Sequence, residues 1–201
     1  MSTIQQKTLR LVQLALLAAI IVVLQQIVIP LPGGLTLSLV LVPIVVGAVL
    51  YGPSAGAVLG GVFGVVVTVL VMTARAGDLS TMMWVANPLV TALICVTKGV
   101  AAGWAAGLVA KAFKKHAFVG IILAAAVAPI VNTGIFLLGM LTVFRDVMMT
   151  FAENIGMGGT GVIYFAVVVL VGINFIVEFA ANLILSPTIA AIVKAIRKTA
   201  Q

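Results

Sequence analysis

Two ionisable side chains lie far inside long apolar segments of this sequence. Glu178 is followed by roughly 16 residues before the next cation, Lys194, which is about 24 Å of helix at 1.5 Å per residue. Lys98 lies ten residues after Pro88, or about 15 Å along its own segment. A charged side chain at the centre of a bilayer costs about 2.5–3.5 kcal/mol on insertion scales. If these segments cross a membrane, both side chains must face protein, water or a ligand.

Asparagines accompany the two charges. Asn174, Glu178 and Asn182 are spaced i, i+4 and i+8, so a helix places them in one polar stripe. Asn132 follows Pro129 in the preceding apolar segment, where an Asn is about as suited to repairing a broken hydrogen-bond ladder as to contacting a ligand. We interpret the set as a binding site for a polar solute. The alternatives are a structural ion pair between Lys98 and Glu178, or a Lys98 ammonium that snorkels to water.

Two further candidates precede the segment that carries Lys98. Asn87 stands directly before Pro88, where Asn can cap a helix and Pro suits the first helical position. Trp84, beside Met82 and Met83, could close the site as a lid, although anchoring at a membrane interface explains this tryptophan equally well. We add Asn87 and Trp84 to the candidate binding residues.

Composition identifies the class of protein. The chain has 201 residues, of which 64% are hydrophobic and 7% charged, and its mean hydropathy is +1.37. A soluble domain carries about 25% charged residues, so this is an integral membrane protein. The position of the charges matters more here than the net +7, and we expect no nucleic-acid partner.

Catalytic machinery is not evident in the sequence. The one histidine, His116, falls in a basic turn, and no His, Cys or carboxylate cluster suggests a metal. No Gly-rich loop ending in Lys-Ser or Lys-Thr appears, so we expect this chain neither to hydrolyse ATP nor to carry a cofactor. Transport or binding is the stronger class.

The apolar segments predict an all-α, six-helix bundle that forms one transmembrane domain over residues 1–201. The predicted spans are 8–28, 37–50, 55–72, 88–110, 117–144 and 161–193. Between the last two spans, residues 145–160 alternate apolar and charged side chains and predict a short amphipathic piece at the interface. Residues 30–36 and 73–86 are expected to be external loops.

The cations alternate between the two sides. Eight of them fall on one side, namely Lys7, Arg10, Lys111, Lys114, Lys115, Lys194, Arg197 and Lys198. Arg75 and Arg145 fall on the other, where Asp78, Asp146 and Glu153 offset them. The positive-inside rule therefore places both termini in the cytoplasm.

Small residues mark three helix faces. Gly56, Gly60 and Gly64 repeat at every fourth residue, as do Gly99, Gly103 and Gly107, and each ladder predicts a close helix contact. Ala15 and Ala19 give the first span a small-xxx-small surface, which ordinary packing would also explain.

Several of these features occur together in one known family. Alanines four apart lie on the first span, and Leu50-Tyr51-Gly52-Pro53-Ser54-Ala55-Gly56 leads into the Gly-rich span. Asn87-Pro88-Leu89-Val90 opens the fourth span, and the last contains Asn174, Glu178, Asn182 and Pro187. In this order, and in a chain of about 200 residues, they resemble the substrate-binding S component of an energy-coupling factor (ECF) vitamin transporter. The resemblance is nearest to the pantothenate, riboflavin and hydroxymethylpyrimidine group.

The resemblance implies a subunit in the plasma membrane of a prokaryote that captures a vitamin from outside. It implies docking, through the face of Ala15 and Ala19, to a transmembrane coupling protein, while two cytosolic ATPases hydrolyse ATP. The family's site lies toward the outer ends of spans 4 to 6, beneath loops that here are residues 30–36 and 73–86.

The residue types in the candidate site bear on which vitamin is bound. Lys98 favours an anionic group, and Asn and Glu side chains suit hydroxyls and amides, so pantothenate fits best. Hydroxymethylpyrimidine, with its amine on Glu178, is an alternative, whereas riboflavin should require more aromatic residues than this chain supplies. Outside the family, Glu178 could be the protonation site of a self-contained ion-coupled carrier, or Lys98 and Glu178 could only join two helices of a membrane scaffold.

Overall fold

Helices form almost all of the structure, a computed structural model that describes residues 3–27, 29–31, 35–37 and 39–199. For residues 3, 29–31, 35–37, 173–174 and 197–199 it describes the backbone only. The elements, in chain order, are α1 (Thr3–Gln26), β1 (Ile29–Leu31), β2 (Leu35–Leu37), α2 (Leu41–Tyr51), α3 (Pro53–Met72), α4 (Asp78–Ala86), α5 (Pro88–Ala112), η1 (Lys114–His116), α6 (Ala117–Thr142), α7 (Arg145–Asn154), α8 (Val162–Tyr164), η2 (Phe165–Gly172) and α9 (Ile173–Thr199).

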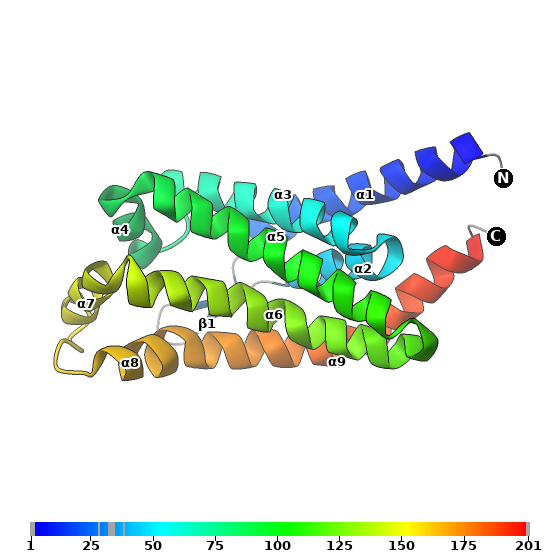
Figure 1. Cartoon of the computed structure of the whole chain (residues 1–201). Coiled ribbons are helices and arrows are strands. Elements are labelled where there is room, and N and C mark those ends of the chain that lie inside the picture. Colours follow the sequence, from blue (N-terminus) through cyan, green and yellow to red (C-terminus); the bar gives the residue numbers. More distant parts are fainter. Residues whose placement is uncertain (1–2, 28, 32–34, 38, 200–201) are drawn as a thin grey trace.

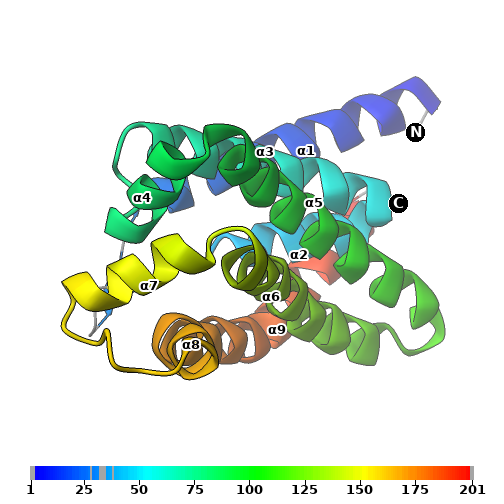
Figure 2. The same ribbon diagram turned by 60° about the vertical axis from the view of Figure 1, so that its left-hand side comes forward.

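The long helices run side by side along one axis (Figure 1). Both termini lie at one end of this bundle, and the short helices α4 and α7 lie at the other (Figures 1 and 2). Within the described residues, five helical segments are long and apolar enough to cross a membrane: 4–26, 53–72, 88–112, 114–142 and 162–196. The chain is therefore a multi-pass membrane protein.

The second predicted span differs most from the structure. Its helix, α2, has 11 residues, which is about 16 Å of helix, or half of a hydrocarbon core. The predicted start at residue 37 was wrong, because Leu37 belongs to β2 and pairs with Ile29 in an antiparallel hairpin. That hairpin occupies the described part of the predicted loop 30–36, and Pro30 is tolerated there because both strands of a two-stranded sheet are edges.

The remaining boundaries shift by smaller amounts. α1 begins before the predicted residue 8, and α9 continues past the predicted residue 193. The last span is also not a uniform α-helix, since η2 is a π-helical stretch of 8 residues that leads into α9.

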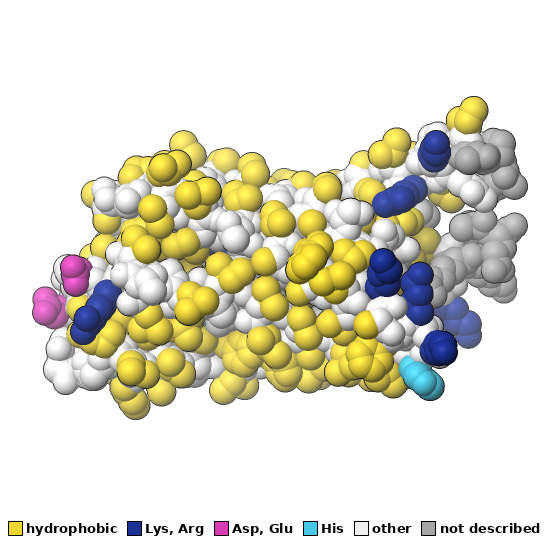
Figure 3. Space-filling model, viewed as in Figure 1, with side chains coloured by type: hydrophobic (Ala, Val, Ile, Leu, Met, Phe, Trp, Pro, Cys, Tyr) yellow, Lys and Arg dark blue, Asp and Glu magenta, His cyan; other side chains and the backbone are white. Residues whose placement is uncertain are grey.

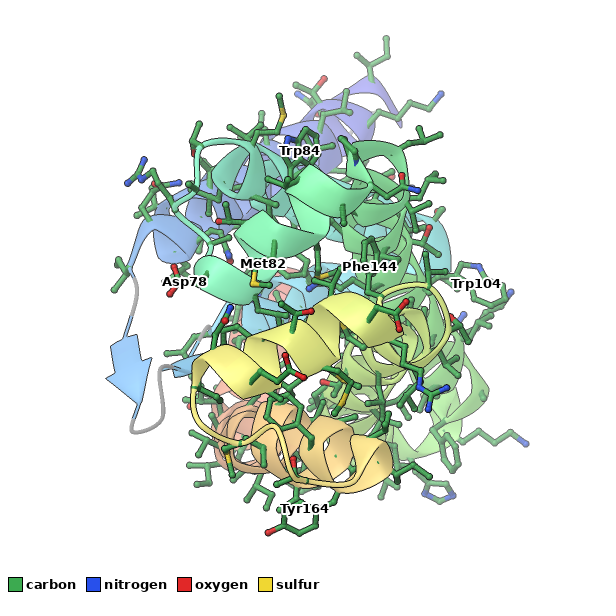
Figure 4. The ribbon with its side chains drawn as sticks, turned by 90° about the vertical axis from the view of Figure 1, so that its left-hand side faces the viewer. Asp78, Met82, Trp84, Trp104, Phe144 and Tyr164 are labelled. Atoms are coloured by element: carbon green, nitrogen blue, oxygen red, sulfur yellow. The ribbon has the colours of Figure 1, made fainter. Side chains whose placement is uncertain are left out.

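Both outer connections contain helix. The prediction of a loop over 73–86 missed a helix, because the second half of this segment is α4. This helix begins after Gly77 and carries Asp78 in its first turn, where a carboxylate interacts favourably with the helix dipole. The amphipathic piece predicted over 145–160 is confirmed as α7, which buries Met148 and Ala152. These two side chains join Met83 of α4, Phe144 and Phe165 in one apolar cluster that caps this end of the bundle. Figure 4 views this end and shows Phe144 between α4 and α7.

The two glycine ladders pack against each other. A Cβ added to Gly60 would lie 2.0 Å from the carbonyl oxygen of Gly99, and one added to Gly103 would lie 2.0 Å from that of Gly56. Contacts this short leave no room for any side chain, so α3 and α5 touch backbone to backbone. The predicted close approach is confirmed, and it fixes α5, which carries Lys98, against α3.

Candidate functional site

A cavity of about 260 Å³ brings together side chains from α1, α3, α5, α6 and the last helical segment. Its polar lining residues are Gln25, Arg75, Ser80, Lys98, Asn132, Thr133 and Glu178. Three residues predicted from the sequence, Lys98, Asn132 and Glu178, therefore face one space although 80 residues separate the first from the last.

Aromatic rings surround the ammonium group of Lys98. Its Nζ lies 5.3 Å from the ring centroid of Phe136 on α6 and 5.8 Å from that of Phe63 on α3. At these distances the electron-rich ring faces attract a cation. The rings thus hold a half-buried charge beside the cavity while leaving it able to meet an anion.

Glu178 is the acidic side chain of the cavity and is 7% exposed. One turn further along α9, Asn182 is fully buried, and its Nδ2 donates a hydrogen bond of 2.9 Å to the backbone carbonyl of Glu178. Asn182 is not among the described residues that line the cavity, so its expected contact with a ligand stays a prediction. The side chain of Asn174, the third member of the predicted stripe, lies outside the described part of the structure.

Asn132 offers an unused acceptor. Its side chain lines the cavity and is 9% exposed, and within the described residues its Oδ1 has no hydrogen-bond partner. A buried amide oxygen without a partner costs free energy, which a bound molecule with an O–H or N–H group would recover. The structure thus contains an acceptor that is suited to a donor on a ligand.

Asn87 and Trp84 lie elsewhere. The Oδ1 of Asn87 accepts a hydrogen bond of 3.1 Å from the backbone N–H of Val90, so the predicted cap of α5 is confirmed. Its side chain is exposed, and Trp84 packs against the cluster of α1, α2 and α3 that includes Phe63. Figure 4 shows Trp84 on the side of α4 that faces away from α7. Neither residue is among the described residues that line this cavity, and their roles in binding stay predictions.

Sequence reasoning missed several lining residues. Arg75 was assigned only to membrane orientation, and Gln25 and Ser80 were not singled out, although all three line the cavity. Phe136 could have been found, because it lies four residues after Asn132 and so shares its helix face. Phe63 had no such signal, since only the packing of α3 on α5 brings it to Lys98.

The arrangement can bind but has little means to catalyse. It combines two cations, Lys98 and Arg75, with the carboxylate of Glu178, an amide acceptor and two hydroxyls. Among the described residues, no three His, Cys, Asp or Glu side chains gather into a metal site. Such a lining suits a small polar molecule that carries an anionic group and hydrogen-bond donors.

Comparison with known families agrees with this geometry. The family described as "ECF transporter, substrate-specific component" matches residues 9–190, which is nearly the whole chain. A comparison with curated proteins finds no match.

Proposed function

Because the chain belongs to the substrate-specific components of ECF transporters, and is thus a vitamin-binding transport subunit and not an enzyme, we propose that its vitamin is pantothenate and that the vitamin binds in the cavity of Lys98, Asn132 and Glu178. The observation that carries this proposal is the convergence of these three side chains, from α5, α6 and α9, on one space.

The chemistry of pantothenate matches the lining group by group. Its carboxylate would pair with the ammonium of Lys98 through a charge-assisted hydrogen bond, and Arg75 at the rim adds a second positive charge. Its hydroxyls would donate to the free Oδ1 of Asn132 and to the carboxylate of Glu178. The carboxylate and both hydroxyls of the ligand then have partners, as buried polar groups require.

One observation favours a second vitamin class. Phe63 and Phe136 line the cavity, so it is more aromatic than the composition suggested. A ring-bearing vitamin such as hydroxymethylpyrimidine or riboflavin could stack on one of these rings, with its amine or imide group on Glu178. These vitamins are the alternative ligands of the same site.

Charge at the two ends supports an orientation. Most of the Lys and Arg side chains in view gather at the end of the bundle that carries the termini, whereas acidic side chains lie at the other end beside a cation, and a broad apolar surface separates the two ends (Figure 3). By the positive-inside rule we place both termini in the cytoplasm of a prokaryote and count α2 as a sixth, short span. The cavity, beside α4 at the opposite end, then opens outward.

The small-residue face of α1 is available to a partner. Ala15 and Ala19 are exposed. Only 6% of the residues in the apolar stretch of α1 are buried within the protein, compared with 50% of those in α3. An apolar groove of about 350 Å³ runs beside α1 along α2 and α9. We assign this face to the transmembrane coupling protein, which would join the chain to two ATPases that hydrolyse ATP.

Calorimetry of the purified full chain against pantothenate, hydroxymethylpyrimidine, riboflavin and other vitamins tests the proposal. We expect nanomolar binding of pantothenate by the chain alone and no uptake into vesicles without the ATPases. Tight binding of another vitamin would overturn the ligand, and proton-driven uptake by this chain alone would replace the account with an ion-coupled carrier that uses Glu178.

A further inference from the structure

A second and larger groove, of about 570 Å³, opens at the end of the bundle that carries the termini. The turn between α2 and α3 forms one wall, and the end of α5, with the start of α6, forms the other. None of the described residues lines both this groove and the vitamin cavity.

The rim of this groove is cationic. Lys111 and Lys114 line it, and both are exposed. On the opposite wall Tyr51 lines the groove, with the guanidinium of Arg10 stacked 5.5 Å from its ring centroid. The hydroxyl of Tyr51 donates a hydrogen bond to the Oε1 of Gln13, which holds the ring and its cation beside the groove.

No acidic side chain of the protein neutralises this rim. The sequence contains four Asp and Glu residues. Asp78, Asp146 and Glu153 belong to the α4 and α7 end, and Glu178 lines the vitamin cavity. No Asp or Glu side chain of the described residues therefore competes with a bound anion at this rim.

The walls below the lysines are apolar. They are formed by Ala48, Val49, Leu50, Ala110, Ala117 and Ile121. A cationic rim above apolar walls suits an amphiphile, whose phosphate meets the lysines while its first acyl carbons lie along the walls; a free phosphate ion would gain nothing from those walls.

We propose that this groove binds the phosphate head group of an anionic phospholipid, with Lys111 and Lys114 as its ligands. Basic pockets between membrane helices on the cytoplasmic side are the usual places for such head groups. The site is separate from the vitamin cavity, so a substitution can abolish lipid binding while vitamin binding is retained, or the reverse.

Native mass spectrometry of the full chain, with phosphatidylglycerol or phosphatidylcholine added to the detergent, tests the proposal. Each lysine near an anionic lipid contributes about fivefold. The double variant Lys111→Gln/Lys114→Gln should therefore retain about 25-fold less phosphatidylglycerol. The matched control Lys7→Gln/Lys115→Gln removes the same charge from exposed positions outside the groove and should reduce retention by much less than the groove variant does.

Three results would overturn the proposal: equal loss in the two double variants, equal retention of the two lipids by the unchanged protein, or displacement of phosphatidylglycerol by an equal concentration of glycerol 1-phosphate. The last would assign the rim to soluble phosphates. Lys111→Arg/Lys114→Arg keeps the charge and should keep the lipid, so the test stands even if the glutamine variant does not fold. Calorimetry with the vitamin on the same samples reports separately on the outer cavity.

Discussion

The ammonium nitrogen of Lys98 lies 5.3 Å from the centre of the Phe136 ring, and this contact joins α5 to α6 at the wall of the cavity. A ring face attracts a cation without neutralising it, unlike a carboxylate. Lys98 is therefore held in place while it keeps a net charge for a ligand. This relationship favours a binding role for Lys98 over a purely structural one.

Replacing Lys98 should weaken binding more than any other single change in the cavity. Lys98→Met keeps the length of the side chain and removes the charge, and we expect a loss of about 2–5 kcal/mol in the affinity for an anionic vitamin. Calorimetry measures this loss. Thr97→Val, at an exposed neighbouring position of α5, is the control and should bind as the unchanged protein does. Equal affinities for the two variants would remove Lys98 from the site.

Phe136→Leu distinguishes the two classes of vitamin. If the ring only steadies Lys98, affinity should fall by about 0.5–1 kcal/mol. If the ring also stacks on a pyrimidine or flavin, the loss should reach about 2 kcal/mol or more. For pantothenate we expect the smaller loss, and Phe118→Leu, an exposed phenylalanine of the same helix, should cause none.

Asn132→Leu should separate stability from binding. The substitution removes a buried amide oxygen that has no partner within the described residues, so the melting temperature of the vitamin-free protein should stay the same or rise. Vitamin affinity should fall by about 1–3 kcal/mol, because the donor of the ligand loses its acceptor. Melting curves recorded with and without vitamin give both values. Lower stability with full affinity would show that Asn132 repairs the helix near Pro129 instead.

The contact between α3 and α5 can be tested at two adjacent glycines. In Gly60→Ala the new Cβ would meet the backbone oxygen of Gly99 at 2.0 Å, so the helices must separate, at a cost of about 1–3 kcal/mol or more. In Gly61→Ala the nearest atom is a side-chain methyl of Val100 at 3.5 Å, and the better helix propensity of Ala should leave stability unchanged or higher. Thermal unfolding in detergent compares them, and similar melting temperatures would contradict the close packing.

The face of Ala15 and Ala19 should matter for assembly and not for vitamin binding. Ala15→Trp/Ala19→Trp places large rings on an exposed surface, so calorimetry with the vitamin should be unaffected. Co-purification with the coupling protein should fall at least about tenfold, as expected when two rings disrupt a close helix contact. Val58→Trp, on an exposed face of α3, is the control for added bulk. Normal assembly of the double variant would move the docking surface elsewhere.

Helical periodicity and charge predicted much of this molecule. They predicted the positions of the long helices, α7, the Asn87 cap and a close-packing face on each glycine ladder, because each depends on residues close together in sequence. That the two ladders contact each other is seen only in the structure. Lys98, Asn132 and Glu178 were found because a polar side chain within a long apolar segment is costly in a membrane and therefore indicates a functional or structural role.

The rest depends on contacts between distant segments. The hairpin of β1 and β2 shortens α2 in a way that its apolar sequence does not indicate, and α4 begins inside what reads as a loop. Phe63 reaches Lys98 only because α3 and α5 touch at their glycines. Asn182 satisfied the same periodicity as Glu178 but is buried one turn away from the cavity, since a stripe that exceeds one turn need not face a single space.

The most direct test of the account is the mass of the small molecule that co-purifies with the full chain. Protein purified gently from cells grown with pantothenate should release that vitamin on denaturation, in near-equal molar amount, and Lys98→Met protein prepared in parallel should release little. A different vitamin released in that amount would contradict the proposed ligand. Release of no small molecule, from protein that also fails to bind any vitamin in calorimetry, would contradict the site itself.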